Sequence, residues 1–215
     1  MDDLLIRCSS LFKIVGTPRK KGEYLTQTAK SYIESIIDKK IYKYDDIIGT
    51  KEVEKGLICE DDSIHLINEL KFTEYDKNTV RLYNEFITGE CDLHIAEEGL
   101  IKDIKTCWSK KTFPKTKTKA KDKSKKAGYP IQGAGYMWLY DCDYFDISYT
   151  LVNTPEHLIG YEDWDLHFMD DIPLELRLTE VRYERDRTIE DKIKEKVEQC
   201  REYAHCYKIQ VENRL

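Results

Sequence analysis

The stretch from Gly89 to Lys105 reads GECDLHIAEEGLIKDIK and contains two apolar runs separated by the short polar turn Glu97-Glu98-Gly99. The first run covers Cys91–Ala96 and the second covers Leu100–Thr106. Apolar runs of this length, bounded by a turn that contains glycine, are typical of two strands joined as a hairpin. The hairpin predicts a sheet at the centre of the chain.

Three charged side chains of this hairpin are expected to converge. Asp103 and Lys105 are two residues apart on one strand, so their side chains point to the same face. Asp92 can reach that face from the neighbouring strand. Two carboxylates beside an ammonium would suit Mg²⁺ or Mn²⁺, with the lysine orienting a water molecule or a phosphate oxygen. A surface hairpin with three solvated charges is the alternative interpretation.

Length and composition indicate one globular domain over residues 1–215. Hydrophobic residues make up 40% of the chain, which includes 15 tyrosines, so a substantial core can form. No apolar run reaches the length of a membrane span, and the first residues do not resemble a signal peptide. The seven scattered cysteines are typical of reduced thiols. We therefore expect a cytoplasmic protein without membrane contact.

The charge of the chain is unevenly distributed. The net charge is −6, yet residues 109–126 contain nine lysines and one aspartate, a local charge of +8 that leaves −14 on the remainder. We expect this segment to be a basic loop, with Lys110 and Lys111 among the residues that contact a phosphate backbone. A solvated lysine loop without a specific partner is the alternative.

Periodic apolar residues predict the other elements of an α/β fold. Near the N-terminus, Arg7, Ser9 and Ser10 form either a phosphate contact or an ordinary helix cap. Gln132 and Tyr136 are four residues apart and share one helix face. Helices are expected over residues 25–42, 50–71, 129–140, 156–159 and 187–212, and strands over 80–87 and 143–152; the rest of 156–185 shows no clear pattern.

Four short motifs occur in a characteristic order. They are Gly-x-x-x-Glu at Gly56–Glu60, Gly-x-x-Asp at Gly89–Asp92, Asp-x-Lys at Asp103–Lys105, and Gln-x-x-x-Tyr at Gln132–Tyr136. In this order the chain resembles the PD-(D/E)XK nuclease superfamily, and within it the phage exonucleases of the lambda-exonuclease and YqaJ type. The resemblance implies a restriction-endonuclease-like core, with a central mixed β-sheet flanked by helices in the order αβββαβ.

The resemblance also implies roles for individual residues. Asp92, Asp103 and the carbonyl of Ile104 would bind Mg²⁺, with Mn²⁺ as a substitute, and Lys105 would orient or help deprotonate the attacking water. Glu60 would hold a second metal ion or its water, although most helical glutamates are simply solvated. Gln132 and Tyr136 would line the DNA-binding face. Some relatives carry a four-cysteine iron–sulfur cluster, which we do not expect here because Cys200 and Cys206 lack its spacing.

The expected activity is Mg²⁺-dependent 5′–3′ digestion of duplex DNA ends in phage-type recombination. The resemblance further implies a homo-oligomer, by analogy a trimer, and a single-strand annealing protein as partner. The same motifs are compatible with an endonuclease. A catalytically silent nucleic-acid-binding protein and a plain α/β scaffold are the remaining alternatives. Retention of all the acidic and lysine positions of the motifs argues against a silent protein.

Overall fold

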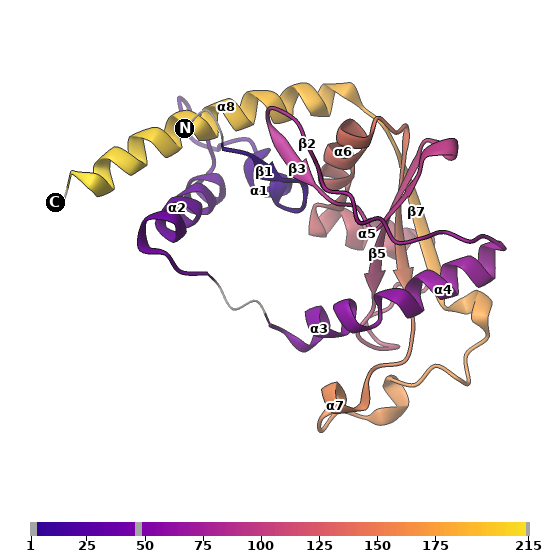
Figure 1. Ribbon diagram of the computed structural model, residues 1–215. Helices are drawn as coiled ribbons and strands as arrows, with labels where there is room; N and C mark the ends of the chain where they lie inside the picture. The colour runs from indigo at the N-terminus through magenta and orange to yellow at the C-terminus, as the bar shows by residue number, and fades with distance from the viewer. Residues whose placement is uncertain (1–3, 46–48, 214–215) are drawn as a thin grey trace.

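The computed structural model describes residues 4–45 and 49–213 and has the mixed α/β architecture that the sequence predicts (Figure 1). Its helices are α1 (Leu11–Ile14), α2 (Gln27–Tyr42), α3 (Lys51–Ile58), α4 (Glu60–Lys71), α5 (Lys117–Ala127), α6 (Tyr129–Tyr140), α7 (Glu156–Ile159) and α8 (Arg187–Glu212). Its strands are β1 (Ile6–Arg7), β2 (Leu82–Tyr83), β3 (Ile87–Gly89), β4 (Leu93–Ile95), β5 (Leu100–Thr106), β6 (Tyr144–Thr150) and β7 (Leu178–Glu184).

A four-stranded mixed sheet with the order β4-β5-β6-β7 forms the centre of the molecule. The hairpin β4-β5 is antiparallel, β5 and β6 are parallel, and β7 runs antiparallel to β6. The parallel pair sets Lys105 beside Tyr149, and Asp103 beside Ile147. Paired residues of neighbouring strands project to the same face, so Tyr149 and Lys105 belong to one side of the sheet.

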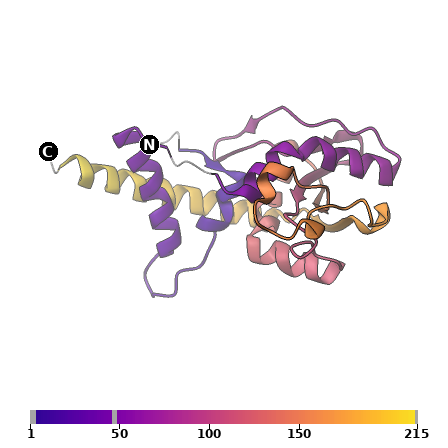
Figure 2. The ribbon, with the colours of Figure 1, turned by 90° about the horizontal axis from the view of Figure 1, so that it is seen from below.

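Helices cover both faces of this sheet. On one face, α6 packs against β5 and β6 while α5 packs against β7; α4 packs against β5 on the other face. Figure 2 shows α4 and α5 on opposite sides of the strands. The long helix α8 lies over α2 and α6 at the far end of the molecule (Figure 1). The side chains on the α6 face, including Asp103, therefore lie between sheet and helix.

The helices expected at 25–42, 129–140, 156–159 and 187–212 are confirmed as α2, α6, α7 and α8. The start of α2 is fixed by Thr26, whose hydroxyl accepts a hydrogen bond from the backbone amide of Ala29 at 3.1 Å. Within residues 4–45 and 49–213, none of the helices has the length and apolar character needed to cross a bilayer.

A single strand over residues 80–87 is a wrong prediction. This segment holds two short strands, β2 and the start of β3, which pair antiparallel with each other. Between them Asn84 makes a turn, because its side-chain oxygen accepts hydrogen bonds from the amides of Phe86 and Ile87. β3 also pairs with β1, so these strands form a separate sheet of order β1-β3-β2 and do not extend the hairpin.

The helix expected over residues 50–71 is two helices, α3 and α4, that meet at Cys59. The backbone of Cys59 leaves the helical region at φ −98° and ψ 17°, and its buried thiol contacts the carbonyl of Asn153. The apolar spacing continues across the break, which is why the sequence does not reveal it. As a result Glu60 is the first residue of α4 and not a mid-helix residue.

The basic segment of residues 109–126 is not simply a loop, because its second half forms α5. Thr116 caps the first turn by accepting a hydrogen bond from the amide of Lys119, and Gly128 ends the helix at φ 78°. Only the small residues Ala120 and Ser124, four apart, are buried. A helix that buries so little apolar surface leaves no clear hydrophobic periodicity in the sequence.

The segment 156–185 contains one strand that the sequence did not reveal, β7. It lies at the edge of the main sheet and pairs with β6 along its full length. Val181 is its one fully buried residue, and its other side chains are partly or largely exposed. A half-exposed edge strand rich in charged residues lacks the apolar alternation that identifies a strand.

Replacing Gly133 with alanine should destabilise the protein. A Cβ at this position in α6 would overlap the ring of Phe145, which is fully buried on β6. Overpacking of this kind costs about 1–3 kcal/mol. As the control, Gly56→Ala in α3 places its Cβ in open space and should raise stability by about 0.5–1 kcal/mol. Thermal unfolding of both variants tests this; equal stability would contradict the close approach of α6 to the sheet.

Candidate active site

The two carboxylates of the hairpin lie together, as the sequence predicts. β4 begins at Leu93, so Asp92 lies just before the strand, and the pairing of Leu93 with Lys102 brings it alongside Asp103. The Asp92 Oδ2 atom accepts a hydrogen bond from the backbone amide of Ile104 at 2.5 Å. This bond holds Asp92 against the strand that carries Asp103.

Asp103 and Lys105 share one face of β5 and form an ion pair. The Lys105 Nζ atom lies 2.5 Å from the Asp103 Oδ2 atom. Burial alone would lower the pKa of Lys105, but the negative charges of Asp103 and Asp92 outweigh it and raise that pKa. Lys105 is therefore a positively charged hydrogen-bond donor beside the carboxylates.

The helix α6 holds Asp103 from above the sheet. The side-chain amide of Gln132 donates to the Asp103 Oδ1 atom at 3.0 Å and lies 3.3 Å from the Tyr136 hydroxyl. Both Gln132 and Tyr136 are buried. Glycine at position 135 lets the helix approach Leu11 and Cys8 closely. The expected shared face of Gln132 and Tyr136 is confirmed, and it is turned toward the carboxylate.

The oxygen atoms of this site fit a hard divalent cation. Asp103 is almost completely buried, and its Oδ2 atom accepts no well-directed hydrogen bond from any residue that the structure describes. Burial and the nearby charge of Asp103 raise the pKa of Asp92 to about 7. A buried carboxylate beside a half-buried one, whose like charges repel each other, forms the kind of donor set that Mg²⁺ or Mn²⁺ prefers.

Glu60 lies at the rim of the site and not within it. It lines the same cavity as Asp92 but forms an ion pair with Lys77 at 2.6 Å. In residues 4–45 and 49–213, no three Asp, Glu, His or Cys side chains are clustered closely enough to hold a metal ion by themselves. A role for Glu60 toward a metal or its water stays a prediction.

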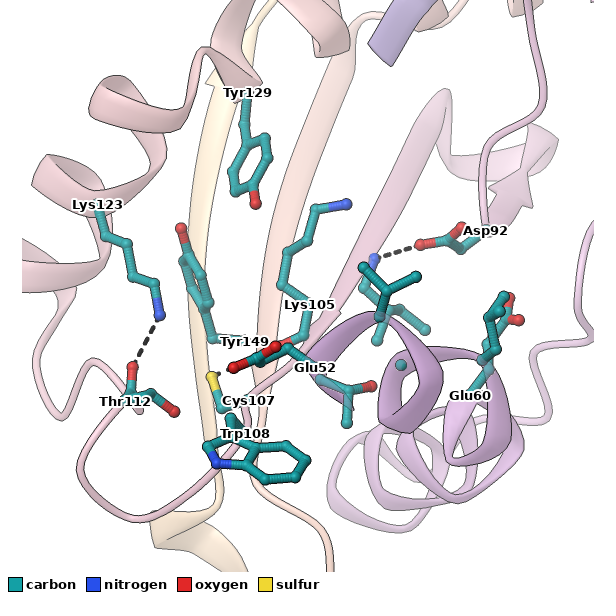
Figure 3. A pocket seen from close by; sticks show the side chains of 15 residues that line it. Glu52, Glu60, Asp92, Lys105, Cys107, Trp108, Thr112, Lys123, Tyr129 and Tyr149 are labelled. Carbon is teal, nitrogen blue, oxygen red and sulfur yellow. Dashed lines mark hydrogen bonds between the residues drawn. The ribbon is translucent and has the colours of Figure 1, made fainter. Parts of the chain in front are cut away.

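A cavity of about 530 Å³ opens beside the carboxylates (Figure 3). Asp92, Ile104 and Lys105 lie on one side of it, and Glu52 and Glu60 from α3 and α4 on another. Its remaining wall consists of Thr106, Cys107, Trp108, Thr112, Lys123, Tyr129 and Tyr149, with Val53, Gly56 and Leu57 of α3. The site is thus a hollow at the end of β5, between the sheet and residues of the helices α3, α4, α5 and α6.

The N-terminal motif packs against α6 outside the cavity. Arg7 ends β1, and Ser9 and Ser10 belong to the short 3-10 turn that follows it. Between them, Cys8 is buried against Gly135 and close to Tyr136. Arg7 and Ser9 are exposed, and none of the three polar residues lines the cavity. Their contact with a phosphate stays a prediction.

The structure does not bring Lys110 and Lys111 into the cavity. The Lys110 Nζ atom forms an ion pair with Asp171 at 2.9 Å, and its backbone amide donates to the carbonyl of Leu166. Lys111 is exposed. Another lysine of the same segment, Lys123, lines the cavity instead.

Sequence reasoning missed the residues on the remaining wall. Tyr129 lies one turn before Gln132 on α6, and its ring is 4.8 Å from the Lys105 Nζ atom. The spacing from Tyr129 to Gln132 could have revealed it. Tyr149 and Lys123 could not be found in this way, because their positions depend on strand register and on the unexpected helix α5.

A buried lysine, Lys55, anchors α3 beside the cavity. Its side chain is fully buried, and its Nζ atom donates to the carbonyls of Cys107, Trp108 and Val152 at 2.8, 3.1 and 2.9 Å. Burial lowers the pKa of Lys55 to about 8, so it is still protonated at neutral pH and uses all three N–H groups. Lys55 thereby ties α3 to the chain that leaves the ends of β5 and β6.

Comparison with solved structures shows that the chain is similar to exonucleases. No family model matches the chain, and no curated protein matches it. A phage related exonuclease from Haemophilus somnus 129PT is 38% identical, with a TM-score of 0.90, over 99% of this chain and 97% of that one. The alkaline exonuclease LHK-Exo from Laribacter hongkongensis has a TM-score of 0.64 at 13% identity over 98% and 92%. A structure of LHK-Exo in complex with dAMP gives 0.63 at 12%.

Proposed function

Since this chain belongs to the family of phage-related exonucleases, with a restriction-endonuclease-like fold, we propose that it is a Mg²⁺-dependent DNA exonuclease that digests duplex ends in the 5′–3′ direction. The observation that carries this proposal is the convergence of Asp92, Asp103, Lys105 and Gln132 on one point of the sheet. An accidental surface hairpin would not bury Asp103 and hold it by a hydrogen bond from a second element. Mn²⁺ is expected to replace Mg²⁺.

The chain supplies the metal ligands and the groups that orient them. Asp92, Asp103 and the Ile104 carbonyl would hold the ion, and Gln132 fixes the orientation of the Asp103 carboxylate. A bound Mg²⁺ would lower the pKa of the attacking water and neutralise charge that develops on the phosphate in the transition state. Lys105 donates a hydrogen bond that positions this water for in-line attack on the phosphorus.

Substrate binding is proposed to extend from the carboxylates in both directions along α6. Arg7, Ser9 and Ser10 would contact a phosphate near the Tyr136 end, and the basic segment of residues 109–126 would contact the backbone near the Tyr129 end. These contacts are independent of sequence and should weaken as salt concentration rises.

The biological setting is proposed from the family alone. We propose that the enzyme acts in phage-type recombination, in the cytoplasm of a bacterial cell, and delivers single strands to an annealing protein. It is proposed to work as a homo-oligomer, with a trimer as the specific expectation. Sedimentation of the purified protein would test the oligomeric state.

Linear duplex DNA should be degraded in the presence of Mg²⁺, while closed-circular duplex DNA should remain intact. EDTA and the Asp103→Ala substitution should each abolish the activity, because both remove the metal site. Cleavage of the circle as well would make the protein an endonuclease on the same core. Binding of DNA without cleavage under any condition would make it a silent DNA-binding protein and contradict the proposal.

A further inference from the structure

One wall of the active-site cavity takes no part in the proposed metal site. It contains Thr112, Lys123 and Tyr149, with Tyr129 above them (Figure 3). The volume of about 530 Å³ is in the range of cavities that hold ligands of nucleotide size. A cleaved phosphate at the carboxylates would occupy only one side, so the neighbouring part of the strand must lie against this wall or leave the cavity.

Lys123 is distinguished from the other lysines of residues 109–126 by its position. Lys110 is paired with Asp171, and the Lys115 Nζ atom donates to the Lys110 carbonyl. Lys117 and Lys121 line shallow hollows beside β7, away from the carboxylates. In this fully described segment, Lys123 is the lysine that lines the active-site cavity.

The ammonium group of Lys123 has two neighbours in this structure, and it can exchange the first of them for a ligand. It donates a hydrogen bond to the Thr112 carbonyl at 2.7 Å and lies 5.2 Å from the centre of the Tyr149 ring. A lysine ammonium has three N–H donors, and the Thr112 carbonyl takes one of them. The attraction between the cation and the aromatic ring restricts the side chain without using the other donors.

Tyr149 carries a second donor next to Lys123. It pairs in register with Lys105, so the two side chains are neighbours on the same face of the sheet. Its hydroxyl is buried and has no hydrogen-bond partner among the described residues. Burial raises the pKa of Tyr149, which keeps the hydroxyl protonated. A buried donor without a partner is unfavourable, and an oxygen atom of a ligand would satisfy it.

We propose that Lys123 and the Tyr149 hydroxyl bind a second phosphate of the DNA strand, adjacent to the phosphate that is cleaved. This inference rests on the proposed nuclease function, because the first phosphate is placed at Asp103 and Lys105. An ammonium and a hydroxyl are suitable donors for a phosphodiester oxygen, and the ammonium gives the stronger, charge-assisted bond. Tyr149 lies between Lys105 and Lys123 in the cavity wall, so a strand whose cleaved phosphate is at Lys105 would pass Tyr149 on its way to Lys123 (Figure 3).

The access of a phosphate to Tyr149 requires a small movement. The hydroxyl is covered in this structure, and the partly exposed Tyr129 and the exposed Lys123 lie in front of it (Figure 3). Rotation of the Lys123 side chain toward the strand would break its bond to Thr112 and uncover the Tyr149 hydroxyl. Both donors would then face the same phosphate oxygen.

The test measures binding of a blunt-ended, fluorescently labelled DNA duplex with Ca²⁺ in place of Mg²⁺, with strand integrity checked on a gel. Lys123→Met should weaken binding about 10-fold, the usual effect of losing one charge-assisted hydrogen bond. It should also lower the slope of log K against log salt by about 0.9. Lys192→Met, at an exposed position of α8 outside the basic segment, is the matched control for the loss of one charge, and Lys123→Arg should largely restore binding.

The position of the bound phosphate is found with single methylphosphonate linkages, which remove one negative charge at a time. Each of the terminal linkages of the duplex is substituted in turn and tested against wild type and Lys123→Met. We expect one linkage, next to the cleaved one, to behave differently from the others. A methylphosphonate there should lower the affinity of the duplex for wild type and leave its affinity for Lys123→Met unchanged. In Tyr149→Phe, a methylphosphonate at the same linkage should weaken DNA binding less than it does in wild type. The thermal stability of this variant should be equal to or above that of wild type, because the hydroxyl that is removed has no hydrogen-bond partner among the described residues.

The outcomes separate this inference from the proposed function. Absence of both DNA binding and metal-dependent cleavage in the wild type would end the proposed function and this inference with it. Cleavage by the wild type, with Lys123→Met binding as tightly as Lys192→Met, would overturn the inference alone. A loss that is equal at every methylphosphonate position would also overturn it, because Lys123 would then act only through general charge. Tighter binding of free dAMP by wild type than by Lys123→Met, without coupling to any linkage, would assign the wall to the released nucleotide instead.

Discussion

Lys105→Ala is expected to lower the rate of DNA cleavage about 10²–10⁴-fold, the range typical of a side chain that handles a proton or a reacting water. The Lys105 ammonium lies 2.5 Å from Asp103 and within the electrostatic field of Asp92. No other lysine of the described cavity wall lies in contact with these carboxylates, since Lys123 is on the far side of Tyr149. Alanine therefore leaves the attacking water without its donor. Single-turnover digestion of linear duplex DNA with Mg²⁺ measures the loss.

The binding of DNA by Lys105→Ala should stay within a few-fold of wild type, because the backbone contacts come from other parts of the chain. Mg²⁺ should still raise its unfolding temperature, since Asp92 and Asp103 are unchanged. Lys21→Ala, on an exposed loop, controls for the loss of one positive charge. Comparable cleavage by Lys105→Ala and wild type would remove Lys105 from the mechanism. Loss of the Mg²⁺ effect would instead mean that Lys105 acts by supporting the metal site.

The part of this fold that could be predicted from the sequence is the part whose side chains repeat with a clear period. Strand β5 was expected at Leu100–Thr106 and is found there, because both of its faces are buried and its ends are marked by Gly99 and Cys107. The convergence of Asp92 on Asp103 followed from hairpin geometry alone, and the pairing of β4 with β5 confirms it. The helical spacing of Gln132 and Tyr136 likewise placed both on one face.

The part that could not be predicted depends on contacts between segments far apart in the chain. Tyr149 stands beside Lys105 only because β5 and β6 pair in parallel with one particular register. Lys123 reaches the cavity only because a lysine-rich segment folds as α5. Lys55 lies within the helix expected over residues 50–71, and the three carbonyls that accept its hydrogen bonds belong to residues far from it in the chain. The hydrophobic periodicity and the composition of a segment do not show which distant residues it will contact.

The opposite face of the sheet carries a buried charge network that should dominate the stability of the fold. The Lys102 Nζ atom donates to Asp146 at 2.9 Å and to Glu180 at 2.8 Å, and all three side chains are largely buried. Arg182 makes two further bonds to Asp146, and Lys71 pairs with Glu180. The network joins three neighbouring strands, β5, β6 and β7. It lies away from the cavity, so its disruption tests the fold and not the chemistry.

Lys102→Met is expected to lower the free energy of unfolding by about 3–5 kcal/mol at neutral pH, because it leaves two buried carboxylates without their shared cation. Lys71→Met is the matched control, since it removes a half-exposed partner of the same Glu180 and should cost no more than about 1 kcal/mol. Denaturant unfolding of the two variants and wild type measures both values. Equal losses in the two variants would contradict a dominant role for the buried pair.

The deficit of Lys102→Met should shrink in acid. Burial alone would raise the pKa of Asp146 and of Glu180. Arg182 and Lys102 nevertheless hold the pKa of Asp146 below its ordinary value of 3.8, and Lys102, with Lys71 and Ser148, holds the pKa of Glu180 below its ordinary value of 4.5. Carboxyls with lowered pKa contribute stability that is complete above those ordinary values and is lost as the pH falls below them. Without Lys102 the pKa values of Asp146 and Glu180 rise. Both carboxyls therefore become protonated, and lose their unfavourable buried charge, at a higher pH in the variant than in wild type. The stability difference should therefore be largest near neutral pH and begin to shrink while the pH is still above the ordinary values of 3.8 and 4.5. A difference that stays constant from neutral to acid pH would mean that methionine destabilises the sheet by packing and not by the loss of charge.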